Sequence, residues 1–365
     1  MKHSEKPRIL FISTAKVIGG GEIYLTNILP LIQTTYDCTL LTTRPVMNLL
    51  RDSVTTHRIR LFPKKIEKIL KRNYRLKRVY YRLYFKRYLR KRRFDIINLQ
   101  EFDGAFVDAL DFKPIILTEQ TRMFVPNNLR MPFKQLFEKI DRVVCVSRQT
   151  LDDVTELGIP KEKCIVIHNG IDTEKFKPSG TEGEYVTWVG RVEEEDKNPL
   201  LFLRIAKAAQ AEGLGYKFRM IGDGSAMQKM RSYASENKLT NLEITGAKKP
   251  AEMLGMYQQA KILCLTSKTE GLPFVVLEAM ACGVPVVSSN VGGLPEIIHS
   301  PKTGVLVDGF SQNRFLDEIK KLMEDNQLYR RTRQAGRVRV EQVFSLKRQL
   351  QQMSEQYEVL LDRYE

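Results

Sequence analysis

Short apolar runs alternate with longer helical stretches along the first half of the chain. The run Arg8–Ser13 leads into a glycine cluster at 19–21 and then a helical pattern over 23–32, which is the order strand, tight turn, helix. Similar β-branched or leucine-rich runs, each separated from the next by a helical stretch, follow at 38–42, 95–99, 115–118 and 143–146. Buried parallel strands have this composition because helices cover both faces of their sheet.

The second half repeats the pattern after a turn at 169–172 and a stretch rich in Pro, Gly, Ser and Thr at 176–184. Strands are predicted at 185–189, 216–221, 242–245, 262–266, 284–288 and 304–307, with helices that include 199–212, 225–237, 250–259 and 274–282. We therefore expect an α/β protein with two doubly wound domains. Their predicted extents are 1–170 and 171–340, followed by a closing helix over 341–365.

Length and composition agree with two globular domains. A chain of 365 residues exceeds what one core organises, and a hydrophobic content of 42% excludes disordered, collagen-like and disulfide-scaffold classes. No apolar run approaches the length of a transmembrane helix, and the start lacks a signal-peptide pattern. The cysteines occur singly in apolar or small-residue runs, which predicts reduced core residues in a cytoplasmic protein: Cys38, Cys145, Cys164, Cys264 and Cys282.

The turn from 267 to 280 carries the most informative chemistry. Ligands of open α/β sheets bind where strands end and helices begin. Pro273 suits a first helical position, so the amides of residues 274–276 would be unpaired and could bind phosphate. Glu270 precedes this helix and Glu278 lies on it. One carboxylate could face a reacting sugar while the other accepts hydrogen bonds from a ribose diol.

The stretch EGLPFVVLEAMACGVPVV, with its two glutamates, resembles the family-4 retaining glycosyltransferases of the GT-B fold (glycosyl transferases group 1). Further matches follow in the expected order, at residues 19–22, 146–147, 166–172, 189–191, 197–199, 222–224 and 291–296. The resemblance covers nearly the whole chain and is least clear from about residue 50 to 95. It implies two Rossmann-like domains with an interdomain cleft, acceptor binding in the first domain and nucleotide-sugar binding in the second. Retention of anomeric configuration follows from the family alone.

The resemblance also implies roles for individual residues. Arg191 and Lys197 look like the cationic pair that neutralises the donor pyrophosphate, and fixed cations can stabilise a departing nucleoside diphosphate without a metal. Glu278 would hold the ribose and Glu270 the hydroxyls of the transferred sugar. The other expected substrate-binding positions are Gly20, Gly21, Gly190, Gly222, Gly271, Leu272, Pro273 and Phe274. No acidic metal-binding pattern is present in the sequence, so we expect no metal and no cofactor, the nucleotide-sugar being a co-substrate.

Two positions depart from the family pattern. Many relatives carry histidines after two strands of the first domain, where this chain has Gln100-Glu101 and Glu119-Gln120. Glu119 could bind the acceptor or act as a base, or the donor phosphate could remove the proton. Two simpler interpretations also stay open: residues 19–21 as a flexible turn, and Arg191 with residues 193–195 as a solvated ion-pair cluster.

The net charge of +16 is concentrated in one segment. Residues 64–93 hold fifteen basic residues and one acid, interleaved with tyrosines and Phe85, and Ile66, Ile69 and Leu70 fall on one helical face. This pattern predicts an interfacial helix on an anionic membrane leaflet, where each near-surface cation contributes roughly 1 kcal/mol. An ordinary solvated face and a nucleic-acid surface use the same cations. We expect the membrane as the partner and no nucleic acid.

Together these patterns predict a retaining hexosyltransferase. It would move a sugar from a nucleotide-sugar to a lipid-linked or other membrane-associated acceptor, or to a polysaccharide, in cell-surface polysaccharide biosynthesis. It would be cytoplasmic and peripheral at the inner face of the membrane. Two alternatives remain: a nucleotide-sugar epimerase, which would need no acceptor, and a non-catalytic subunit of a polysaccharide-assembly complex, for which Gln100 and Glu119 are the only hint.

Overall fold

The computed structural model describes residues 6–13, 20–50, 52–58, 74–100, 107, 109–120 and 137–364. The chain divides into two compact units. Unit 1 consists of Met1–His168 together with Gln349–Glu365, and unit 2 of Asn169–Arg348. The sequence predictions for residues 14–19, 59–73 and Glu101, including the apolar face of Ile66, Ile69 and Leu70, lie outside the described residues.

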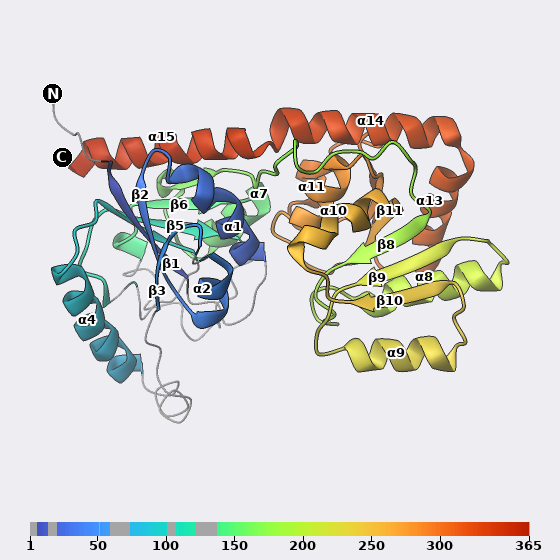
Figure 1. Cartoon of the computed structure of the whole chain (residues 1–365), viewed down its shortest axis with the longest axis horizontal. Helices are drawn as coiled ribbons and strands as arrows, with labels where there is room; N and C mark the ends of the chain where they lie inside the picture. The colour runs from blue at the N-terminus through green and yellow to red at the C-terminus, as the bar shows by residue number, and fades with distance from the viewer. Residues whose placement is uncertain are drawn as a thin grey trace. The chain divides into compact units, whose positions relative to one another are not determined.

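Unit 1 is built on a parallel sheet whose described strands run in the order β3-β2-β1-β4-β5-β6-β7. Helices cover both faces, with α15 on one side and α4 on the other (Figure 1). On the α4 side, Tyr81 and Phe85 pack against buried strand residues such as Leu10, Ile97 and Leu117. The strands are β1 (Arg8–Ser13), β2 (Asp37–Thr42), β3 (Thr55–Arg58), β4 (Ile96–Leu99), β5 (Ile115–Glu119), β6 (Arg142–Cys145) and β7 (Cys164–Val166).

The C-terminal helix α15 docks on unit 1 through its tyrosines. The Tyr357 hydroxyl accepts a hydrogen bond from Asn98 Nδ2 in β4 at 2.7 Å, and the Tyr364 hydroxyl donates to Asp141 Oδ1 at 2.6 Å. The helices with described bounds in this unit are α1 (Gly20–Ile32), α2 (Arg44–Leu50), α4 (Tyr74–Arg90), α7 (Arg148–Glu156), η2 (Lys161–Lys163) and α15 (Leu346–Tyr364), whose first turn lies in unit 2.

Unit 2 contains a six-stranded parallel sheet in the order β10-β9-β8-β11-β12-β13. Its strands are β8 (Tyr185–Val189), β9 (Lys217–Ile221), β10 (Leu242–Gly246), β11 (Ala260–Leu265), β12 (Val286–Ser289) and β13 (Val305–Val307). Its helices are α8 (Pro199–Ala211), α9 (Met227–Glu236), α10 (Pro250–Gln258), α11 (Phe274–Ala281), α12 (Leu294–Ile297), α13 (Gln312–Glu324) and α14 (Asn326–Val343). Helices lie on both faces of this sheet as well (Figure 1).

The predicted α/β fold of two Rossmann-like, doubly wound units is confirmed, with three local differences. The edge strands β3 and β7 were not predicted. The single helix expected from residue 341 is interrupted at Phe344 and Ser345, where the main chain of Ser345 pairs with Ile171. Pro273 caps α11 instead of occupying its first helical position. No helix in the described ranges has both the length and the apolar character needed to cross a bilayer.

Candidate functional site

The carboxyl edge of the unit 2 sheet has its switch point at β8, because β9 lies on one side of β8 and β11 on the other. Ligands of doubly wound sheets bind in the crevice at such a point. Gly190 and Gly222 follow β8 and β9, and their backbones approach very closely: a Cβ at Gly222 would lie 1.8 Å from the Gly190 carbonyl oxygen. Gly222 also has φ +145°, which favours glycine. The backbone geometry of this edge therefore requires glycine at position 222, whereas a Cβ at Gly190 would lie 3.2 Å from the Trp188 ring.

We expect Gly222→Ala to lower the free energy of unfolding of unit 2 by more than about 3 kcal/mol, because backbone strain and the clash with Gly190 add. The matched control is Gly215→Ala, where a Cβ meets no atom within 4 Å and the expected change is within about 1 kcal/mol. Urea denaturation of both variants measures the difference. Equal stability of the two variants would contradict the close approach.

A buried ion pair joins the loops that follow β8 and β11. Lys197 Nζ donates to Glu270 Oε1 at 2.6 Å, and Ser267 Oγ donates to the same oxygen at 2.6 Å. The side chains of Lys197 and Glu270 are only 19% and 6% exposed. The sequence indicated the lysine and the glutamate but not their direct contact, and it gave no reason to choose Ser267.

The position of Lys197 is fixed by the core of unit 2. Thr266 Oγ1 donates to the carbonyl oxygens of Lys197 and Asn198, at 3.3 and 3.0 Å, and accepts from the indole of the fully buried Trp188 at 3.1 Å. Asn198 adopts a left-handed conformation immediately before helix α8. Lys197 is therefore held on a rigid turn. A side chain that must contact a substrate in one defined geometry needs such support.

Arg191 is placed differently. Its guanidinium lies 3.2 Å from Glu193 Oε2 and 3.9 Å from Asp196 Oδ2, and its side chain is 47% exposed. Arg191 therefore forms the ion pair with Glu193 that the sequence suggested, and a second, longer one with Asp196, which the sequence did not suggest. Exposed pairs of this kind contribute little to stability, so the guanidinium can exchange Glu193 for an anionic ligand at small cost.

Helix α11 presents its N-terminus at the same edge of the sheet. The Val276 amide donates to the Pro273 carbonyl oxygen at 3.2 Å, so the expectation of three free amides is wrong for Val276. The amides of Phe274 and Val275 form no hydrogen bond within the described chain. The preceding loop is held by the Leu272 carbonyl, which accepts from Asn169 Nδ2 at 3.0 Å.

The loop after β12 packs directly on the glutamate loop. Gly292 has φ +56°, and a Cβ there would lie 1.9 Å from the Glu270 carbonyl oxygen. The Gly293 amide donates to the Gly271 carbonyl oxygen at 2.8 Å. These contacts hold the main chain of the turn that carries Glu270.

Glu278 lies one turn into α11, where its carboxylate accepts a hydrogen bond from the Tyr257 hydroxyl of α10 at 2.5 Å. The side chain is partly exposed, yet protein atoms surround the carboxylate, and this burial raises the pKa of Glu278 to about 7. Tyr257 has no signal in the sequence, because α10 contributes it from 21 residues away. Glu278 is thus a desolvated carboxylate that accepts one hydrogen bond from the described chain and can accept further hydrogen bonds from a ligand.

Unit 1 has a polar group at the corresponding edge of its own sheet. Gly20 and Gly21 begin α1, and a Cβ at Gly21 would lie 3.8 Å from Gln120 Cγ. Glu119 ends β5 and is buried. Gln100 donates from Nε2 to Asn98 Oδ1 at 2.8 Å, whereas its own Oε1 and the Nε2 of Gln120 are buried and have no hydrogen-bond partner among the described residues. Buried amides with unused capacity indicate a polar ligand or water at this edge.

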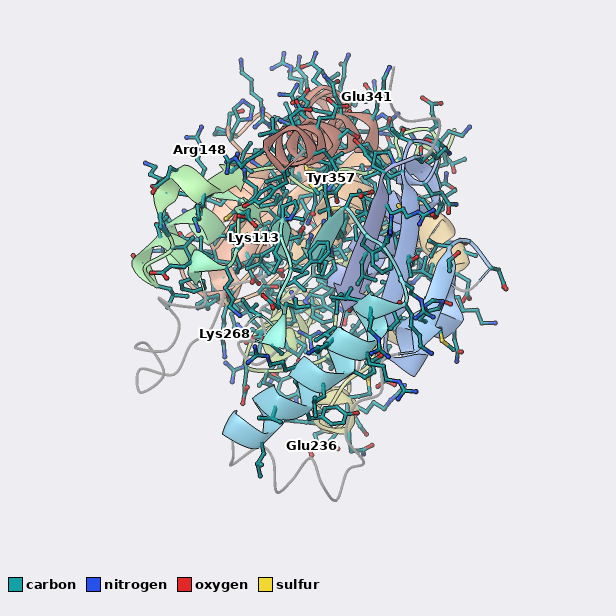
Figure 2. The ribbon with its side chains drawn as sticks, turned by 90° about the vertical axis from the view of Figure 1, so that its left-hand side faces the viewer. Lys113, Arg148, Glu236, Lys268, Glu341 and Tyr357 are labelled. Atoms are coloured by element: carbon teal, nitrogen blue, oxygen red, sulfur yellow. The ribbon has the colours of Figure 1, made fainter. Side chains whose placement is uncertain are left out.

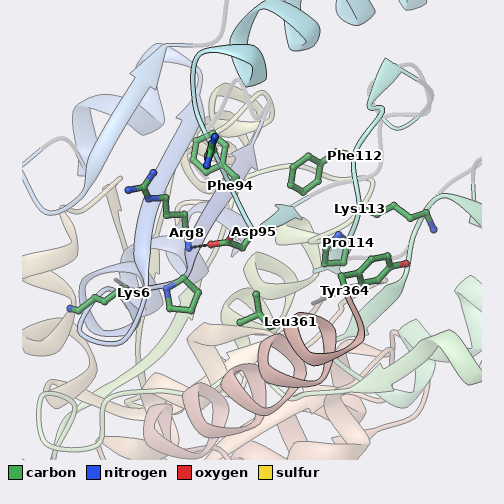
Figure 3. A pocket seen from close by; sticks show the side chains of 11 residues that line it. Lys6, Arg8, Phe94, Asp95, Phe112, Lys113, Pro114, Leu361 and Tyr364 are labelled. Atoms are coloured by element: carbon green, nitrogen blue, oxygen red, sulfur yellow. Dashed lines mark hydrogen bonds between the residues drawn. The ribbon is translucent and has the colours of Figure 1, made fainter. Parts of the chain in front are cut away.

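A cavity of about 490 Å³ lies at the opposite edge of this sheet, beside Arg8, Asp95, Pro114 and Tyr364 (Figure 3). Although lysines line it, the charged ends of Lys6 and Lys113 point away from its centre in this view. Lys113 instead contacts Asp141 Oδ1 at 2.9 Å, and Lys6 donates to a main-chain carbonyl. We therefore assign this cavity no role in substrate binding.

The groups at the two strand edges suit ligands of different chemistry. The edge of unit 2 offers two cations, two amides at a helix N-terminus and two partly buried carboxylates, which together fit a phosphorylated, hydroxyl-bearing ligand. The edge of unit 1 offers neutral amides and one buried carboxylate, which fit hydroxyl groups. Among the described residues there is no cluster of three or more His, Cys, Asp or Glu side chains that could hold a metal ion.

Comparison with known sequences gives two family matches. A family model described as Glycosyl transferases group 1 matches residues 171–339, and one described as Glycosyltransferase Family 4 matches residues 18–175. An uncharacterized glycosyltransferase of Methanocaldococcus jannaschii is 28% identical over 54% of this chain and 53% of its own length. A putative colanic acid biosynthesis glycosyltransferase of Escherichia coli is 29% identical over 50% of this chain and 48% of its own length. The chain thus spans about half the length of the curated relatives it matches.

Solved structures resemble the whole chain. A glycosyltransferase of Rickettsia africae superposes with a TM-score of 0.81 at 18% identity, covering 98% of this chain and 99% of its own. Anabaena HepE in complex with UDP-glucose superposes with a TM-score of 0.77 at 17% identity, covering 97% and 100%. At these identities the likeness shows the fold alone. The two family matches together span residues 18–339. With this likeness of fold, they identify the chain as a GT-B protein of the glycosyl transferases group 1 and Glycosyltransferase Family 4 type.

Proposed function

We propose that this protein is a retaining hexosyltransferase that uses a nucleotide-sugar donor and a membrane-associated or polysaccharide acceptor. The observation that carries the proposal is the buried cluster of Lys197, Glu270 and Ser267 at the switch point of the unit 2 sheet. A stability function does not call for a buried ion pair there, because such pairs rarely stabilise a fold more than apolar groups do. A substrate that replaces one partner accounts for its presence.

In the proposed donor complex, each group meets the part of the nucleotide-sugar that its chemistry suits. Lys197 and Arg191 turn from their carboxylate partners to the pyrophosphate, and the amides of Phe274 and Val275 donate to its oxygens. Glu278 accepts hydrogen bonds from the ribose diol. Glu270, released from Lys197, accepts from the transferred sugar. As the bond to the sugar breaks, negative charge grows on the leaving phosphate and the two cations stabilise it.

We place the acceptor hydroxyl at the polar edge of unit 1. The free Oε1 of Gln100 can accept from a hydroxyl, and the free Nε2 of Gln120 can donate to one. Glu119 ends the same strand that leads to Gln120 and is the candidate base. A Glu119→Gln variant with undiminished turnover would instead point to the donor phosphate as the proton acceptor.

The biological setting is part of the proposal. A putative colanic acid biosynthesis glycosyltransferase among the relatives supports cell-surface polysaccharide biosynthesis. The basic, aromatic-rich face of α4 supports a peripheral position at the cytoplasmic face of the inner membrane. We also propose that the reaction needs neither metal nor cofactor, because Arg191 and Lys197 supply the positive charge. Turnover abolished by excess chelator would contradict this part.

A thermal-shift screen tests the donor site. Purified protein is mixed with UDP, GDP and ADP, and the UDP series comes first because HepE was solved with UDP-glucose. A ligand at a hundredfold excess over its dissociation constant stabilises the native state by about 2.7 kcal/mol. We expect one nucleotide to raise the melting temperature, Arg191→Ala and Glu278→Ala to remove the shift, and Lys229→Ala, a cation of α9, to leave it intact.

Incubation with the matching nucleotide-sugar then tests the reaction. Product analysis should find the sugar on an acceptor, or on water, with its anomeric configuration retained. A rearranged nucleotide-sugar formed without acceptor would identify an epimerase, and the absence of any nucleotide shift would identify a non-catalytic subunit.

A further inference from the structure

A second cavity, of about 750 Å³, lies along α4 beside the edge strand β3. Helix α4 lies on the outside of unit 1 and faces the viewer in Figure 2. Apart from His57 of β3, the cavity is lined by α4 and the turn after it: Tyr80, Leu83, Tyr84, Arg87, Tyr88, Lys91 and Arg92. It shares no residue with either strand edge to which we assign the sugar substrates.

A row of stacked aromatic rings forms one wall. Tyr80 stacks on Tyr84 with ring centroids 6.4 Å apart, Tyr84 on Tyr88 at 6.2 Å, and Tyr88 on Phe94 at 6.3 Å. The three tyrosines are only partly buried, and they pack against the core beneath α4. The i, i+4 spacing brings their rings together on one face of the helix. The wall is thus rigid, and it offers a ligand both apolar ring faces and polar hydroxyl groups.

Three cations line the same cavity. Arg87, Lys91 and Arg92 are exposed, and none of them pairs with a carboxylate in the described chain. Arg92 lies over the Tyr88 ring at 4.5 Å from its centroid, and the hydroxyl of Tyr88 is hydrogen-bonded to His57 Nδ1 at 2.7 Å. Positive charge that no described carboxylate neutralises, next to hydrogen-bonding groups, suits a phosphate.

The surface beside the cavity is apolar. Leu76, Val79 and Leu83 are 53%, 54% and 65% exposed, and their i, i+3, i+7 spacing places them on one face of α4. Large side chains this exposed, in a row and next to cations, are the arrangement with which a helix lies in a membrane interface. Leu83 belongs to both the row and the cavity wall.

We propose that this cavity binds the phosphate group of an individual anionic lipid, so that α4 attaches to the membrane at a built headgroup site. Arg87, Lys91 and Arg92 contact the phosphate, the tyrosine row contacts the glycerol or headgroup, and Leu83 with its neighbours meets the acyl region. The inference rests on the proposed function for its membrane setting. It goes further, because diffuse attraction to a charged surface needs the cations but neither the cavity nor the aromatic wall.

The decisive test compares two double variants of the same helix region. Arg87→Gln/Lys91→Gln removes two cations from the cavity, and Lys86→Gln/Arg90→Gln removes two exposed cations of α4 that do not line it. Binding to phosphatidylcholine vesicles doped with phosphatidylglycerol is measured by flotation at high ionic strength, where attraction between exposed charges is screened. We expect the cavity variant to bind at least about tenfold more weakly than the control variant. If the two variants lose vesicle binding equally, the cavity is not a headgroup site, and diffuse electrostatic attraction alone accounts for the binding.

A second arm separates a lipid from soluble phosphate. Leu83→Ser should weaken vesicle binding several-fold and leave the binding of inorganic phosphate unchanged. If inorganic phosphate alone raises the melting temperature of Arg191→Ala, in which the proposed phosphate site of unit 2 is weakened, as much as vesicles do, and adding Arg87→Gln/Lys91→Gln removes that rise, the cavity serves a soluble phosphate and the proposal fails. Circular dichroism and the nucleotide-induced shift of unit 2 should be the same in all variants, so failure of the headgroup site is distinguishable from failure of the donor site.

Discussion

Replacing Glu278 by glutamine is expected to stabilise the ligand-free protein at pH 8 while it removes nucleotide binding. Burial raises the pKa of Glu278 in the folded protein to about 7, above its ordinary value near 4.5 in the unfolded chain. Between these two values the native state binds more protons, so stability falls as the pH rises. Above pH 7 the buried carboxylate costs up to about 3 kcal/mol, and a neutral glutamine avoids that cost.

Urea denaturation across pH 5 to 8 measures this effect. The advantage of Glu278→Gln over the wild-type protein should be largest at the alkaline end and shrink toward about pH 4.5. Glu236→Gln, an exposed carboxylate of α9, is the matched control and should change stability little at any pH. A Glu278→Gln protein that is less stable than wild type at pH 8 would show that Tyr257 fully compensates the charge.

The same variant tests the functional role. A carboxylate accepts two hydrogen bonds from a diol, whereas a glutamine side chain offers one oxygen and a misplaced donor. The nucleotide that stabilises the wild-type protein should therefore no longer stabilise Glu278→Gln. A residue that lowers stability and is needed for binding is characteristic of a functional site. An unchanged nucleotide shift would exclude Glu278 from the ribose site.

Most of the fold was predictable because parallel strands are buried on both faces. β1 and β5 contain the apolar runs ILFI and IIL, β8 is apolar apart from Thr187, and the helices between strands supply the expected periodicity. The strand β3 was missed because its sequence, TTHR, is polar and lies at the edge of the sheet. The break between α14 and α15 was missed because it depends on a main-chain pairing of Ser345 with the distant Ile171. Periodicity carries no information on such a contact.

The residues of the candidate site were predictable where they directly follow the end of a strand. The glycines near β8 and β9 and the two glutamates of the α11 turn were indicated by their residue types and order. Their partners were not, because Tyr257 and Ser267 reach the glutamates only through the packing of α10 and of a strand-end turn. The aromatic row of α4 was only partly predictable. The spacing of its tyrosines is visible in the sequence, but the cavity beside it also depends on His57 of β3.

Lys197→Met should lower kcat by about 10²–10³, the usual cost of removing one fixed group that stabilises developing charge. The main chain of Lys197 is held by Thr266, so the position of this cation is fixed. Lys229→Met is the control, because this exposed lysine of α9 pairs with Glu194 and also belongs to unit 2. Its kcat should stay within a factor of two or so of wild type.

A double-mutant cycle with Glu270→Gln distinguishes the two roles that Lys197 could have. Lys197→Met leaves Glu270 with Ser267 as its one side-chain partner among the described residues, which should cost up to about 3 kcal/mol of stability. Adding Glu270→Gln removes the unpaired charge and should restore that stability, because the two side chains are in direct contact. Because Glu270 is itself proposed to contact the sugar, the kcat of the double variant is compared with that of Glu270→Gln alone. If Lys197 acts on the leaving phosphate, the double variant has a much lower kcat than Glu270→Gln although the fold has recovered. If Lys197 only neutralises Glu270, the two variants have the same kcat, and the proposed role of Lys197 in catalysis is wrong.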